Sequence, residues 1–85
     1  MNRHQRRKEN KKQNRSALLQ IELLKAIKTH SSGDLILAKD MYLKLYAKDN
    51  SNYDLVRHLG ILYQDLKENE KAYNYFLKAI ELRQN

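Results

Sequence analysis

The scarcity of helix-breaking residues is the feature that most constrains this chain of 85 residues. It contains no proline and only two glycines, Gly33 and Gly60. A β-sandwich or barrel needs frequent turns rich in these two residue types, so the sequence favours long helices instead. Cysteine is absent as well. Disulfide bonds, thiolate nucleophiles and cysteine-ligated zinc sites are therefore excluded.

The spacing of apolar residues is helical from Ala17 onward. Apolar side chains recur every three or four positions in four segments, and no segment shows the alternation of a strand. The breaks at 31–33, 49–52 and 67–69 carry Ser, Gly, Asp or Asn, which end or cap helices. The sequence predicts an all-α fold with four helices, over residues 17–30, 34–48, 53–66 and 69–83.

The two halves of this region match when the sequence is shifted by 34 residues. At this offset small residues align with small residues and aromatic residues with aromatic residues: Ala26 with Gly60, Ala38 with Ala72, and Tyr42 with Phe76. Small residues let two helices approach closely, and aromatic rings fill the space beside the contact. We expect these six residues to pack in the core, where they specify a fold and not a chemistry.

The second half resembles the tetratricopeptide repeat (TPR) family, whose period is about 34 residues. The family pattern of Trp, Leu-Gly, Tyr, Ala and Phe reads here as Val56, Leu59-Gly60, Tyr63, Ala72 and Phe76. The resemblance implies a TPR-like solenoid of two antiparallel helix pairs in a domain over residues 16–85, with repeats at 19–52 and 53–85. Val56 departs from the family tryptophan.

In this family the first helix of each pair lines a concave groove, so the resemblance implies a protein interaction module that binds a peptide or partner helix. The implied partner-binding residues are Gln20, Leu23, Ile27, His30, Asp54, Arg57, Ile61, Gln64 and Asp65. The set lacks the several Lys, Arg and Asn residues of the family's carboxylate-clamp subgroup. We therefore do not expect it to recognise acidic C-terminal chaperone tails.

The C-terminal end of the sequence predicts an uncovered surface. Repeat proteins usually need about three repeats and a polar terminal cap. Here the second of two repeats ends with Arg83-Gln84-Asn85. We expect part of the last helix's apolar face to be open, and self-association or docking through residues 53–66 and 69–83.

Residues 1–15 form a basic tail with seven cations and one acid, a net charge of +6. They have no apolar residue after Met1, which predicts disorder or a frayed helical extension, with Ser16 capping a helix that begins at Ala17. Such a tail attracts nucleic acid by counterion release, although no aromatic residue is interleaved for base stacking. A nucleic-acid-associated protein is thus an alternative, and its candidate residues are Arg3, Arg6, Arg7, Lys8, Lys11, Lys12 and Arg15.

The sequence carries no recognisable catalytic, cofactor or metal motif. His4, His30 and His58 have no second ligand at metal-site spacing, and two isolated glycines cannot form a phosphate-binding loop. We expect no enzymatic activity, cofactor or metal. In a further alternative, also based on the resemblance, the chain is the N-terminal TPR portion of a larger bacterial glycosyltransferase or sulfotransferase. No secretory signal or apolar run of membrane-spanning length occurs, so we expect a cytoplasmic protein.

Overall fold

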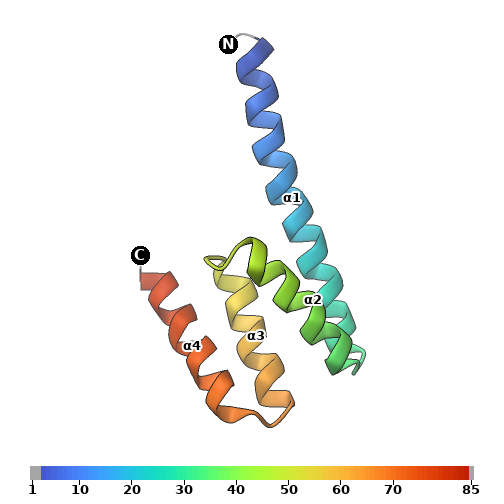
Figure 1. Ribbon diagram of the computed structural model, residues 1–85, viewed down its shortest axis with the longest axis vertical. Helices are drawn as coiled ribbons and strands as arrows, with labels where there is room; N and C mark the ends of the chain where they lie inside the picture. Colours follow the sequence, from blue (N-terminus) through green and yellow to red (C-terminus); the bar gives the residue numbers. More distant parts are fainter. Residues whose placement is uncertain (1–2, 85) are drawn as a thin grey trace.

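The computed structural model describes residues 3–84, and the side chains of residues 17–84. Over these residues the chain is helical without strands, which confirms the prediction of an all-α fold with four helices (Figure 1). The helices are α1 (Arg3–Ser31), α2 (Leu35–Lys48), α3 (Tyr53–Asp65) and α4 (Asn69–Gln84). The bounds of the last three differ from the predicted ones by one residue at most.

The first helix is longer than predicted. It begins at Arg3 rather than at Ala17, so the prediction that Ser16 caps a helix is wrong. Residues 3–15 contain good helix formers such as Arg, Lys, Gln and Glu, with no glycine, proline or β-branched residue that would end the helix. The N-terminal part of α1 projects beyond the other three helices (Figure 1).

The helices form two antiparallel pairs, α1 with α2 and α3 with α4, joined by the packing of α2 on α3 (Figure 1). The helix α1 touches α3 only slightly, and no close backbone contact joins α1 to α4 within residues 3–84. In a closed up-and-down four-helix bundle the first and last helices would be neighbours. The arrangement is therefore open, with each helix packed mainly on the next one along the chain.

The turns inside the two pairs are equivalent at an offset of 34 residues. Each has a residue with a left-handed backbone two positions after the end of its first helix: Gly33 with φ +96° after α1, and Lys67 with φ 66° after α3. Two backbone hydrogen bonds recur in both turns. The left-handed residue donates its N–H to the carbonyl three residues earlier, at 3.0 Å in both cases (Gly33 to His30, Lys67 to Gln64). The next residue donates its N–H to the carbonyl five residues earlier (Asp34 to Thr29 at 3.3 Å, Glu68 to Tyr63 at 2.9 Å). Both turns are Schellman motifs.

Side-chain caps begin the middle two helices at the predicted breaks. The Oδ1 of Asp34 accepts from the N–H of Leu37 at 3.2 Å, and the Oδ1 of Asn52 accepts from the N–H of Leu55 at 3.1 Å. These bonds satisfy donors that a helix N-terminus otherwise leaves free. The cap residues thus fix the positions at which α2 and α3 begin.

The small residues and rings pack as predicted. Ala26, Ala38 and Tyr42 have no exposed surface, and Ala72 is also buried. The ring of Phe76 lies directly against Gly60, where a Cβ atom would be 2.6 Å from the ring carbon Cε1. Glycine at this position therefore lets α3 and α4 approach with an aromatic ring between them.

The buried face of α1 is narrow. Leu23 and Ala26 are buried, whereas the neighbouring apolar residues Ile21 and Leu24 are 50% and 57% exposed. The partner helix covers only one face of α1, and these two side chains lie away from it. Within the described residues, no helix has both the length and the apolar character that crossing a bilayer requires.

Candidate functional site

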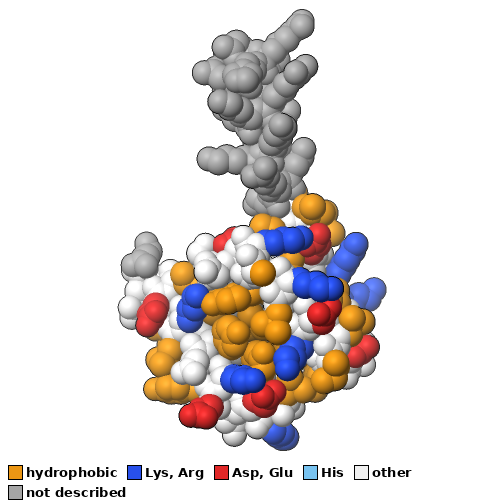
Figure 2. All heavy atoms as spheres, viewed as in Figure 1, with side chains coloured by type: hydrophobic (Ala, Val, Ile, Leu, Met, Phe, Trp, Pro, Cys, Tyr) orange, Lys and Arg blue, Asp and Glu red, His pale blue; other side chains and the backbone are white. Residues whose placement is uncertain are grey.

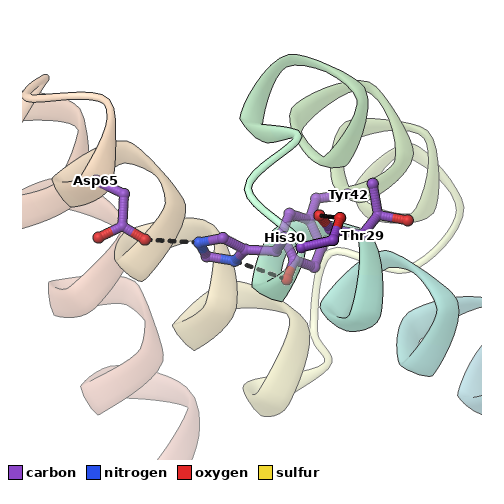
Figure 3. Close-up of polar contacts among 5 residues, drawn as sticks. Thr29, His30, Tyr42 and Asp65 are labelled. Carbon is purple, nitrogen blue, oxygen red and sulfur yellow. Dashed lines mark hydrogen bonds and ion pairs between the residues drawn. The ribbon is translucent and has the colours of Figure 1, made fainter.

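Two of the nine predicted partner-binding residues meet at the junction of the helix pairs. The Nε2 of His30, near the end of α1, lies 2.7 Å from the Oδ2 of Asp65, at the end of α3. The other ring nitrogen, Nδ1, lies 3.1 Å from the hydroxyl of Tyr42 on α2. Figure 3 shows the imidazole between the carboxylate and the phenol. The three side chains thus link three helices.

The donors and acceptors of this link follow from its chemistry. A carboxylate only accepts, so the Nε2–H of His30 donates to Asp65, and in the tautomer with its hydrogen on Nε2 the Nδ1 atom accepts the O–H of Tyr42. Burial, reinforced by the negative charge of Asp65, raises the pKa of Tyr42 to about 12. The phenol therefore remains a neutral donor across the physiological pH range, and the link holds the two helix pairs together.

Two more predicted residues, Arg57 and Ile61, line an apolar hollow at the outer surface of α3 and α4. The hollow has a volume of about 480 Å³ and is also lined by Tyr53, Phe76, Ala79, Ile80, Arg83 and Gln84. We call it the α3–α4 hollow. Ile80 is 54% exposed there. The uncovered apolar surface predicted for the last helix is thus present.

Two arginines border this hollow, and one of them is fixed in place. The Nη1 of Arg83 lies 3.3 Å from the hydroxyl of Tyr53, and its guanidinium lies 5.6 Å from the centre of the same ring. No carboxylate lines the hollow among the described residues. The sequence predicted an uncovered surface at this end of the chain, but the lining residues on α4 were not among the predicted partner-binding residues. The spacing of Phe76, Ile80 and Arg83, on one helix face, is the signal that could have found them.

The other predicted partner-binding residues do not join either group. Leu23 is only 7% exposed and belongs to the core, so its prediction as a surface residue is wrong. Ile27 is half-buried and packs against the same core. Gln20, Asp54 and Gln64 are exposed, and no side-chain hydrogen bond or ion pair is found for them in the described part of the chain.

The basic residues of the tail can be placed only by their backbone. All seven belong to α1, but their side chains lie outside the described residues, so their predicted binding role stays a prediction. Among the described side chains, no group of three His, Cys, Asp or Glu residues is arranged to hold a metal ion. The expectation that the chain binds no metal also stays a prediction.

Comparisons with known proteins add no relative. No family model, curated protein or solved structure gives a significant match to this chain. The function proposed below is therefore based on the geometry of the described residues.

Proposed function

We propose that the chain is a protein interaction module, a TPR-like solenoid of two helix pairs. Three features support this architecture: the equivalent turns at Gly33 and Lys67, the open packing order of the helices, and the small-on-ring contact of Gly60 with Phe76. Solenoids bury their core by stacking, which leaves an end surface on which a further helix can pack.

The occupant we propose for the α3–α4 hollow is an amphipathic helix or peptide that carries acidic residues beside its apolar ones. The observation behind this proposal is the composition of the hollow. Ile61, Phe76 and Ile80 offer apolar surface, while Arg57 and Arg83 add two positive charges without a lining carboxylate. Apolar side chains of the partner gain from burial, and its acidic neighbours pair with the guanidinium groups.

Charge favours a different protein over a second copy of this chain. In a symmetric dimer the same patch faces itself, which would bring the arginines of both copies together in the interface. Like charges placed opposite each other weaken such contacts. We therefore propose a partner with acidic character, and self-association becomes a competing outcome of the test.

The test selects binding peptides from a phage-displayed library of helical peptides. The full chain is the target, and the affinities of selected peptides are then measured by fluorescence anisotropy. We expect enrichment of peptides that combine Leu, Ile or Phe with Asp or Glu. Ile80→Asp should abolish their binding. The matched control is Ile36→Asp, because Ile36 is 72% exposed on α2 and should leave binding unchanged.

Two results would contradict the proposal. Selected peptides could bind equally well to both isoleucine variants, which would place their site elsewhere. Alternatively, sedimentation could show a stable dimer of the unmodified chain that Ile80→Asp dissociates and Ile36→Asp does not. The hollow would then be the contact between copies.

A further inference from the structure

A second surface, distinct from the α3–α4 hollow, is built from lysines and tyrosines. On α2, α3 and α4 these side chains gather into what we call the lysine–tyrosine cluster: Lys39, Tyr46, Tyr63, Lys71, Tyr75 and Lys78. Figure 2 shows hydrophobic side chains, a class that there includes tyrosine, at the centre of the face that α2 and α4 border, with Lys and Arg side chains around them. None of these residues belongs to the predicted binding set.

The three rings hold one another in fixed positions. Tyr63 and Tyr75 stack with centroids 5.4 Å apart and planes at 5°, and Tyr46 meets Tyr75 edge-on at 5.8 Å. Tyr63 is buried, whereas Tyr46 and Tyr75 are half-buried and keep part of their rings at the surface. A ligand therefore meets a preorganised aromatic surface rather than loose side chains.

The lysines are held beside these rings. The Nζ atoms of Lys39 and Lys71 lie 5.6 and 5.5 Å from the centre of the Tyr63 ring. The Nζ of Lys78 lies 4.9 Å from the centre of the Tyr46 ring and 2.6 Å from its hydroxyl oxygen. These are cation–π distances. The contacts keep three ammonium groups close to the aromatic surface.

The cluster carries an excess of positive charge. Within the described residues, the single carboxylate within ion-pair distance of its lysines is Glu68, whose Oε1 lies 3.3 Å from the Nζ of Lys71. A hollow of about 390 Å³ opens between the side chains. It is lined by Tyr46, Tyr63, Lys71, Asn74, Tyr75 and Lys78 and by no carboxylate of the described chain. Its polar groups are mainly hydrogen-bond donors, which suits an anion.

We propose that this hollow binds single-stranded nucleic acid, with phosphates at Lys71 and Lys78 and a base against the exposed parts of Tyr46 and Tyr75. Lysines that follow a backbone and aromatic rings that receive bases are the combination by which proteins bind single strands without sequence preference. A purely carboxylate ligand would use the lysines but gain nothing specific from the rings. The basic residues 1–15 would attract the same polyanion from a distance.

The test compares two pairs of substitutions that remove equal charge from the full chain. One pair is Lys71→Gln with Lys78→Gln. The control pair is Lys44→Gln with Lys48→Gln. In the unmodified chain the Nζ of Lys44 lies 3.0 Å from Asp40 and the Nζ of Lys48 lies 3.7 Å from Glu22, outside the cluster. Binding of a short fluorescein-labelled oligouridylate is followed by fluorescence anisotropy over a range of salt concentrations.

Each phosphate contact to a single strand contributes about 0.7 to the slope of log K against log salt concentration. We expect the Lys71/Lys78 pair to reduce that slope by about 1.4 and the affinity in about 0.1 M salt by about 25-fold. The Lys44/Lys48 pair should leave both nearly unchanged. Equal losses for the two pairs would show that binding follows net charge alone and would overturn the proposal.

An NMR titration of the unmodified chain makes the test independent of how the variants fold. With oligouridylate, we expect the ring signals of Tyr46 and Tyr75 to shift together with the side-chain signal of Lys78. Inorganic polyphosphate, which has no bases, should shift the lysine signal and leave the ring signals nearly in place. Shifts confined to residues 1–15, or equal ring shifts with both ligands, would contradict base binding in this hollow.

Discussion

The contact between Gly60 and Phe76 gives a quantitative test of how α3 and α4 pack. On helix propensity alone, Gly60→Ala should stabilise the protein by about 1 kcal/mol, because glycine is a poor residue for a helix interior. The structure predicts the opposite sign. The new Cβ would lie 2.6 and 2.7 Å from two carbon atoms of the Phe76 ring, and overpacking of this kind costs about 1–3 kcal/mol. We expect Gly60→Ala to lower the free energy of unfolding by about 1 kcal/mol.

A second substitution isolates the cause of this loss. In a Phe76→Leu background the ring is absent, so Gly60→Ala should regain its helix-propensity benefit and stabilise by about 1 kcal/mol. The coupling between the two sites is then about 2 kcal/mol, well above the deviation expected for residues that do not touch. A change of sign between the two backgrounds is therefore the signature of the contact.

The assay is urea unfolding at 25 °C followed by far-UV circular dichroism, for the wild type, both single variants and the double variant. A loss of about 1 kcal/mol should also lower the midpoint of thermal unfolding by about 4–8 °C in a domain of this size. Equal stabilisation of both backgrounds by Gly60→Ala would show that the ring of Phe76 does not lie on Gly60.

Three further predictions concern the turns and the titrating groups. Lys67→Gly should stabilise the fold by about 1 kcal/mol because φ is 66° there, and Gly33→Ala should destabilise it by a similar amount because φ is +96°. Urea unfolding measures both changes. No change in either variant would contradict the equivalence of the turns. Because the pKa of Tyr42 is raised to about 12, its protonated phenol stabilises the fold below pH 10, and this contribution is lost as the pH rises to about 12. In a titration of absorbance at 295 nm, Tyr42→Phe should remove the ionisation step at about pH 12. Hydrogen bonds from Ser51 lower the pKa of Asp49, so Ser51→Ala should raise it toward its ordinary value in a carboxyl ¹³C titration.

The fold was largely predictable because its signals are local. The positions of helix-ending residues such as Gly33 and Asp34 set the helix bounds, and the alignment of Ala38 with Ala72 located the close contacts. A helix over residues 3–15 was predicted only as one alternative, a frayed extension, because a change in composition at Ser16 was interpreted as the start of the first helix. Helix-forming polar residues continue a helix without apolar packing, so composition alone does not mark its end.

The candidate surfaces were less predictable because they depend on contacts between helices. His30 and Asp65 were both proposed for a groove, but their pairing with each other and with Tyr42 needs the distances between α1, α2 and α3. Leu23 was misplaced because its position on a first helix does not show whether the neighbouring helix covers it. The lysine–tyrosine cluster has a visible signal on α4, where Lys71 and Lys78 flank Tyr75 along one face, but its other members come from two more helices.

In the structure the two helix pairs stack against each other as one body. The most direct measurement is an NMR NOESY experiment on the full chain that detects contacts between the pairs. Stacked pairs should give cross-peaks between the Tyr46 ring and the Lys78 side chain, whose Nζ lies 2.6 Å from the phenol oxygen, and between His30 and the end of α3. Strong contacts within each pair, with none between the pairs, would contradict this stacking.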